Sequence, residues 1–251
     1  MPDAAFLSIS EVALRAGVSQ ATVTRFVATP GFASYAEFRA ALRHAILGGG
    51  APTGESSGDP VGTDPVAEAT TNLAALSDTL GSAAMEAAVA ALARATTVGI
   101  VGIRASAALA TYAGYFARRI VDDVRVVTDG DSVGDTLVEM AASGRAAALV
   151  FAMPRYPAST VRALRHAREL RVPTVLVVDT PFVDFASCAT HVLVAPVGTG
   201  LVFDSHAAAV VLAMALLDGI AGAHPRRTQE RLEAHESMVA TWVHQPTSDP
   251  D

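Results

Sequence analysis

The sequence predicts an α/β fold, in which a doubly wound, five-stranded parallel sheet follows a small all-helical head. Five short, nearly continuous apolar runs alternate with helical stretches, which is typical of parallel strands covered on both faces. A segment rich in Gly, Pro, Ser and Asp, residues 48–65, separates these runs from the first predicted helices. We therefore expect a helical head at residues 1–47, a flexible linker at 48–65 and an α/β domain at 66–245.

The individual elements follow from apolar spacing and capping residues. In the head, helices that a serine can cap are expected at residues 8–16, 19–27 and 34–47. The expected strands span residues 97–103, 124–128, 146–153, 173–179 and 191–196. The expected helices of the α/β domain span residues 66–80, 82–95, 106–121, 133–142, 158–171, 182–188, 204–222 and 226–243. Right-handed crossovers between such strands place helices on both faces of the sheet.

Composition limits the classes of protein to which the chain can belong. With 251 residues and 51% hydrophobic residues, it can form one medium domain and a small one. Its 18 basic residues, all Arg, stand against 25 acidic ones, and the net charge of −7 argues against a protein that coats nucleic acid non-specifically. The head is close to neutral, which permits a small DNA-reading module.

The sequence also indicates where the protein works. Cys188 is the only cysteine, so no internal disulfide can form and a reducing compartment is expected. No signal peptide opens the chain, and the longest apolar helical candidate, residues 207–223, is interrupted by Asp218 and short for a membrane span. We expect a cytoplasmic protein without a membrane partner. No paired metal ligands or dinucleotide-type glycines occur, so we expect no cofactor.

The segment ISEVALRAGVSQATVTRF has the spacing of a helix-turn-helix motif. Ala13 is small where two helices must cross closely, and Gly17 follows four residues later, where the turn favours a positive φ. Val18, Val23 and Phe26 are expected to hold the second helix against the first. An ordinary helical hairpin that binds nothing is the alternative. A stable unit needs a third helix, either residues 34–47 or a segment upstream of the given start.

The second helix of this motif is expected to read DNA. Its exposed Gln and Arg side chains can make bidentate contacts to purine edges, and an Ala can touch a thymine methyl. Hydroxyls near its amino terminus can reach phosphates. The residues expected to contact operator DNA are Ser19, Gln20, Ala21, Thr22, Thr24 and Arg25.

Three loops that follow predicted strands can hold an anion, because ligands of open parallel sheets sit beyond the carboxyl ends of the strands. In VGIRASAALA, Ser106 begins a helix whose amino terminus presents N–H groups, and Arg104 adds positive charge. A plain helix cap explains the same turn. In FDSHAAA, Asp204 or Ser205 can cap a helix and His206 lies in its first turn, although such a histidine is usually structural or exposed.

The loop MPRYPAST carries more polar groups. Arg155 and Tyr156 project from a strand end, and Ser159 and Thr160 begin the next helix. Two hydroxyls at a positive helix end beside an Arg make an anion-binding arrangement, and the two prolines stiffen the loop. A proline-rich turn with a capping serine is the alternative.

Taken in order, these segments resemble the RpiR-type regulators, which join an amino-terminal helix-turn-helix to a sugar isomerase (SIS) domain. The resemblance covers nearly the whole chain, from FLSISEVALRAGVSQATVTRF and GFASYAEFRAAL to NLAALSDTL, VGIRASAALA, FAMPRYPASTV and LRVPTVLVVDT. It implies a transcription regulator that controls sugar-catabolism genes, responds to a phosphorylated sugar and forms a homodimer or homotetramer. It also implies that Ser106, Ser159 and Thr160 line the phosphate site.

The sequence departs from the family's pattern around the third and fourth strands. Arg145 stands where SIS domains often carry an acidic residue, and the loop MPRYPAST has no Gly. Val183 stands where a Ser-Pro-Leu-Ala-like segment often begins. These departures leave room for an effector other than the family's usual ligand.

Two other functions fit parts of the sequence. A phosphosugar isomerase on the same scaffold would need a general base, commonly a Glu, and a His to help open the sugar ring. Only His206 is well placed by sequence, since Glu139 and Glu169 lie on helices away from the expected ligand edge, so we expect no enzyme activity. A sugar-phosphate binding protein without DNA affinity is the third alternative.

Overall fold

A computed structural model of the chain describes residues 9–28, 35, 38, 64–197 and 203–242. The predicted linker and the third predicted head helix lie almost entirely outside the described residues. The chain divides into two compact units, Met1–Ala69 with Gly198–Ser205, and Thr70–Val197 with His206–Asp251. Within the described residues, no single helix is long and apolar enough to cross a membrane.

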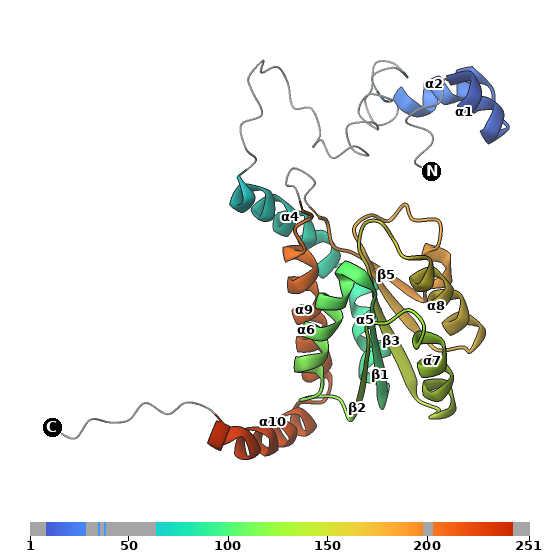
Figure 1. Cartoon of the computed structure of the whole chain (residues 1–251). Helices are drawn as coiled ribbons and strands as arrows, with labels where there is room; N and C mark the ends of the chain where they lie inside the picture. The colour runs from blue at the N-terminus through green and yellow to red at the C-terminus, as the bar shows by residue number, and fades with distance from the viewer. Residues whose placement is uncertain (1–8, 29–34, 36–37, 39–63, 198–202, 243–251) are drawn as a thin grey trace. The chain divides into compact units, whose positions relative to one another are not determined.

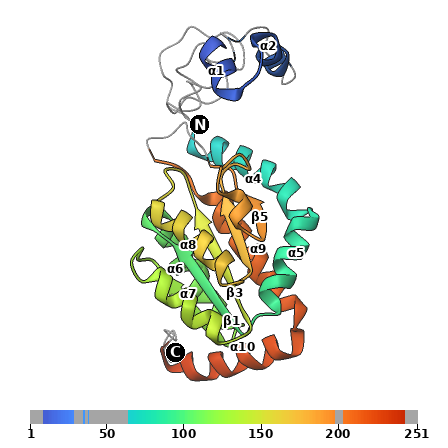
Figure 2. The same ribbon diagram turned by 90° about the vertical axis from the view of Figure 1, so that its right-hand side faces the viewer.

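The second unit is built on five parallel strands in the order β2-β1-β3-β4-β5 (Figures 1 and 2). The strands are β1 (Thr97–Gly102), β2 (Asp123–Val127), β3 (Ala146–Ala152), β4 (Thr174–Val178) and β5 (His191–Val194). Each lies within two residues of its predicted bounds, which confirms the predicted fold class. The chain places β2 on one side of β1 and then returns to add β3 on the other side. The winding direction therefore reverses between β1 and β3.

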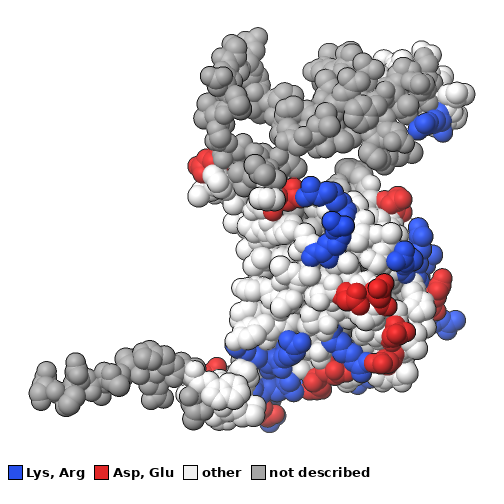
Figure 3. Space-filling view, in the orientation of Figure 1, with Lys and Arg blue, Asp and Glu red and all other residues white. Residues whose placement is uncertain are grey.

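Helices cover both faces of the sheet (Figures 1 and 2). Those that share an apolar core with the sheet are α4 (Pro65–Leu80), α5 (Ala83–Ala93), α6 (Ala107–Ala117), α7 (Val133–Ala142), α8 (Ala158–Glu169) and α9 (Ala207–Ala223). The last helix, α10 (Pro225–Val239), follows α9 and buries no residue. Helices α5, α6 and α9 share one apolar core with side chains such as Phe151, and α7 and α8 share the other with side chains such as Leu164. Few charged side chains lie on the face over α6 and α9 (Figure 3).

The helix predicted at residues 182–188 is wrong. The connection from β4 to β5 holds only a three-residue 3-10 turn, Ala186–Cys188. Phe185 is buried in the core and packs edge-on against Tyr156, with ring centroids 5.1 Å apart. A helix of seven residues forms few backbone hydrogen bonds, which hardly offset the free-energy cost of nucleating it. Burial of the Phe185 side chain therefore favours the observed loop over the predicted helix.

The first unit contains the two helices of the predicted motif, α1 (Ile9–Ala16) and α2 (Gln20–Ala28). Gly17 joins them at a φ of +67°, as its place in the turn predicts. The Val18 N–H donates to the Ala13 carbonyl at 3.0 Å, and the Gly17 N–H donates to the Leu14 carbonyl at 3.3 Å. This pair of hydrogen bonds is the Schellman arrangement, which satisfies the last carbonyls of α1.

The apolar contacts of the head differ in part from those predicted. Ala13 and Val23 are buried, as expected. Val18 and Phe26 are 42% and 64% exposed, so they do not hold α2 against α1. The Phe26 ring instead meets the Phe38 ring edge-on, with centroids 6.4 Å apart. Phe38 belongs to the third segment predicted as a helix, residues 34–47. Phe26 therefore packs toward that segment rather than toward α1.

Candidate functional site

A pocket of about 450 Å³ lies where the loops after β1 and β3 diverge. This is the point at which the winding of the sheet reverses, where open α/β sheets usually bind ligands. We call it the rim pocket. It is lined by Ile103, Arg104, Ala105, Ser106, Met153, Pro154, Arg155 and Pro157. Three predicted ligand residues, from two different loops, therefore meet in one cavity.

Both arginines of the rim pocket have left-handed backbones. Arg104 has a φ of 58° and Arg155 a φ of 66°. Only one other non-glycine residue in the described part of the chain, Arg171, shares this conformation. A left-handed backbone costs an L-residue roughly 1–2 kcal/mol, and such residues cluster at functional sites. Each of the two loops, after β1 and after β3, therefore places one arginine at the pocket in a strained backbone conformation.

Ser106 ties the two loops together. It lies in a 3-10 turn, Arg104–Ser106, and its hydroxyl accepts a hydrogen bond from the Met153 N–H at 3.3 Å. The side chain is 3% exposed and caps no helix, so it contributes to the pocket as a buried link. Gly102 makes this possible, because a Cβ there would lie 2.2 Å from the Ser106 carbonyl oxygen.

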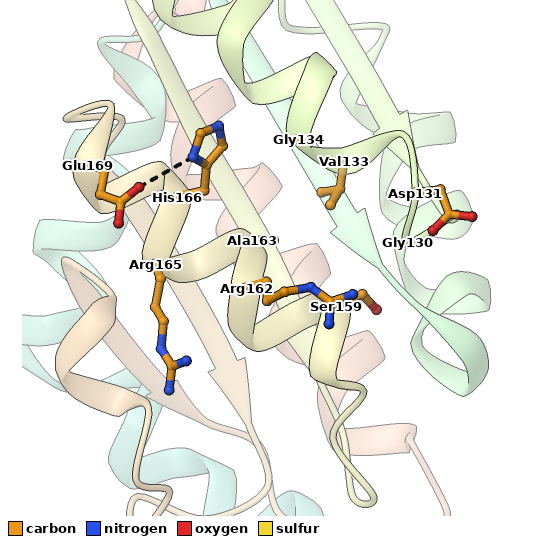
Figure 4. Close-up of a pocket in the computed structure, with 10 residues that line it drawn as sticks. All are labelled: Gly130, Asp131, Val133, Gly134, Ser159, Arg162, Ala163, Arg165, His166 and Glu169. Carbon is orange, nitrogen blue, oxygen red and sulfur yellow. Dashed lines mark ion pairs between the residues drawn. The ribbon is translucent and has the colours of Figure 1, made fainter.

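Ser159 and Thr160, predicted to act together, point in different directions. Thr160 is 1% exposed, and its hydroxyl oxygen has no hydrogen-bond partner within the described structure. Ser159 lines a second cavity of about 540 Å³ between α7 and α8 (Figure 4). Successive residues of a helix do not face the same side, which explains the separation. Neither hydroxyl lines the rim pocket.

We call this second cavity the α7–α8 groove. It is lined by Gly130, Asp131, Val133, Gly134, Ser159, Arg162, Ala163, Arg165, His166 and Glu169. Although it is the larger cavity, it lies between two helices rather than at the carboxyl ends of the strands. The rim pocket is therefore the stronger candidate for a ligand site of this sheet.

Tyr156 links the loops after β3 and β4. Its hydroxyl donates to Asp179 Oδ1 at 2.5 Å, and its ring packs on Phe185. Burial, with the hydrogen bond and charge of Asp179, raises the pKa of Tyr156 well above its ordinary value. Tyr156 is thus a neutral side chain with a structural partner, and it does not line the rim pocket.

Ser205 and His206 precede α9, which begins at Ala207. The His206 side chain makes no capping hydrogen bond, and Ser205 belongs to the other compact unit. In the described structure neither residue lines the rim pocket.

The predicted DNA-reading face is exposed along α2. The side chains of Ser19, Gln20, Ala21, Thr22, Thr24 and Arg25 are all exposed. Ser19 caps the helix as predicted, because its hydroxyl oxygen accepts the Thr22 N–H at 3.2 Å. The Thr22 hydroxyl lies 2.9 Å from that of Ser19, and the Thr24 hydroxyl donates to the Gln20 carbonyl at 3.0 Å.

The two glutamates considered as catalytic bases, Glu139 and Glu169, do not line the rim pocket. Glu139 accepts a hydrogen bond from Arg125 at 2.8 Å, and Glu169 pairs with His166 at 3.5 Å. Among the described residues, none that lines the rim pocket carries a carboxylate, and no cluster of three potential metal ligands occurs. The arrangement can bind an anion through arginines and backbone N–H groups.

Comparisons with known proteins agree with this architecture. No protein-family model matches the sequence, and no curated protein does. The sugar isomerase domain of an RpiR transcription factor from Sphaerobacter thermophilus is 31% identical; the match covers 69% of this chain and 98% of that one, with a TM-score of 0.60.

Two further structures share the fold at lower identity. The Vibrio vulnificus NanR protein, complexed with ManNAc-6P, is 21% identical over 97% of this chain and 89% of its own, with a TM-score of 0.63. A Listeria monocytogenes protein described as a candidate sugar-phosphate isomerase is 15% identical over 68% of this chain and 92% of its own, with a TM-score of 0.57. At these identities the likeness concerns the fold alone.

Proposed function

The chain belongs, through its sugar isomerase domain, to the family of the RpiR transcription factors, and on this premise we propose that it is a DNA-binding regulator. Its operator affinity changes when a phosphorylated sugar binds the rim pocket. One observation carries the proposal: two arginines in strained left-handed conformations line a pocket where the winding of the sheet reverses. Strain of this kind persists where a pre-organised site needs it.

The chemistry of the rim pocket suits a phosphate. Arg104 and Arg155 offer planar donor groups that match phosphate oxygens, and the turn at Ser106 presents backbone N–H groups at the start of α6. Proton transfer on a sugar needs a carboxylate or similar base, which the described lining of this pocket lacks. These features favour binding over isomerisation.

The exposed face of α2 supports the DNA-binding half of the proposal. A helix capped by Ser19 and carrying Gln20 and Arg25 has the side chains that read purine edges in the major groove. We include a homodimer or homotetramer in the proposal, because two such helices one DNA turn apart read a pseudo-palindrome. The protein then has two states, which differ in the placement of the two heads. The effector binds one state more tightly than the other and so changes the affinity for the operator.

A two-part experiment tests this function. A thermal-shift screen of sugar phosphates on the full chain should find at least one ligand that raises the melting temperature. That ligand should also change the mobility shift of DNA from upstream of the gene. Arg25→Ala should weaken operator binding by about 1–3 kcal/mol and relax one base position. A catalytic turnover of the same ligand, without any mobility shift, would favour the isomerase instead.

A further inference from the structure

We propose that the α7–α8 groove is a second ligand site, which binds a small organic phosphate with a compact apolar part. The groove is separate from the rim pocket, and this inference stands without the proposed function. With a volume of about 540 Å³ it has room for a molecule of metabolite size. Its floor is apolar and one end is cationic (Figure 4).

Gly134 keeps the floor of the groove open, although the surrounding packing leaves room for a larger residue there. Gly134 lies in the first turn of α7, and a Cβ added there would meet no atom within 4 Å. Glycine in a helix is less stable than alanine at the same position, so Gly134 is not optimal for stability. Together with Val133 and Ala163, it leaves a shallow apolar surface against which a hydrocarbon or ring can pack.

One end of the groove is fixed by a second glycine. A Cβ at Gly130 would lie 2.8 Å from the Cβ and hydroxyl oxygen of Ser159, so the loop before α7 rests directly on the first turn of α8. This close approach gives the floor a defined edge. It also places the Ser159 hydroxyl at that edge, beside the positive end of the α8 dipole.

The cationic group at this end is Arg162. It stands three residues after Ser159 on α8, a spacing that makes the two side chains neighbours, and Figure 4 shows the guanidinium extended toward the serine. Within the described part of the chain, Arg162 has no hydrogen-bond or ion-pair partner. Arg125 and Arg231 of the same domain, by contrast, each hold an aspartate. An arginine left available beside a hydroxyl suits a phosphate.

The other charged residues of the groove do not compete for this position. Glu169 is paired with His166 at 3.5 Å, and the side chain of Arg165 points away from α7 (Figure 4). The carboxylate of Asp131 points away from α8 (Figure 4). A ligand would therefore place its phosphate on Arg162 and Ser159, and its apolar part on Gly134.

Isothermal titration with two probes tests the site. The titrations use full-length protein carrying Arg104→Gln and Arg155→Gln, which removes both guanidinium groups from the rim pocket. Phenyl phosphate should bind about tenfold more tightly than inorganic phosphate, because only its ring packs on the floor. Arg162→Gln should weaken both probes about tenfold, whereas Gly134→Leu should abolish only the advantage of the ring.

Matched variants complete the test. Arg168→Gln removes the same charge from α8 outside the groove and should leave both affinities within about twofold. Circular dichroism and melting curves confirm that each variant is folded. Equal effects of Arg162→Gln and Arg168→Gln, no effect of Gly134→Leu, or no binding of phenyl phosphate would each overturn the proposal.

Discussion

The rim pocket and the α7–α8 groove lie in the same domain but are built in different ways. Backbone shapes the rim pocket: two arginines with positive φ, and a glycine, Gly102, that has no room for a Cβ. In the groove, only the end at Gly130 is as closely packed, and the floor at Gly134 faces open space. Strained backbone is tolerated only where the surroundings enforce it. The rim pocket is therefore pre-organised, while the floor of the groove at Gly134 has room to change.

Adding one methyl group at each glycine should separate the two regions most clearly. Gly102→Ala places a Cβ 2.2 Å from the Ser106 carbonyl oxygen and should lower the free energy of unfolding by about 3 kcal/mol. Gly134→Ala meets no atom and should raise that free energy by up to about 1 kcal/mol. Urea unfolding of both variants measures the contrast. Equal stability of the two variants would remove the distinction between the regions.

Removing guanidinium groups should affect effector binding in one region only. Arg104→Gln with Arg155→Gln should weaken binding of the sugar phosphate found by the screen at least about tenfold, because charged hydrogen bonds to phosphate are lost. Arg162→Gln, in the groove, should leave this affinity unchanged. Titration calorimetry compares the variants. Similar losses in both would mean that net charge, rather than the rim pocket, governs binding.

Strands β1, β3 and β4 were predictable because a strand buried on both faces has to be apolar along nearly its whole length. The residues of the candidate ligand sites were harder to predict. Consecutive hydroxyls at residues 159 and 160 look like one group in the sequence, yet on the helix Ser159 lines the groove and Thr160 is buried. The partner of Tyr156 is 23 residues away, and nothing local indicates it. Gly102 carried a usable signal, since glycine at a strand end often marks a close approach. Nothing in the sequence indicates that Arg104 and Arg155 have left-handed backbones.

The buried hydroxyl of Thr160 sharpens the contrast with its neighbour. Thr160→Val removes an oxygen that has no hydrogen-bond partner in the described structure and keeps the shape of the side chain. It should raise the free energy of unfolding by about 1 kcal/mol, because an unsatisfied buried polar atom is eliminated. Ser159→Ala, on the groove side, should change it little. Thermal or urea unfolding distinguishes the two, and a destabilised Thr160→Val would reveal a hydrogen bond at this hydroxyl.

A comparably small effect is expected where Tyr156 links the loops after β3 and β4. Tyr156→Phe removes the 2.5 Å hydrogen bond to Asp179 and should cost about 1 kcal/mol near neutral pH. Because folding raises the pKa of Tyr156, its contribution is fully present below the ordinary pKa of about 10 and is lost as pH rises through the folded value. The difference between wild type and variant should therefore shrink above about pH 10. A constant difference at all pH values would contradict this assignment.

A crystal structure of the full chain with a bound sugar phosphate tests the central claim most directly. We expect the phosphate in the rim pocket, within hydrogen-bonding distance of Arg104, Arg155 and the turn that holds Ser106. A sugar phosphate bound elsewhere in the protein, with this pocket empty, would contradict it.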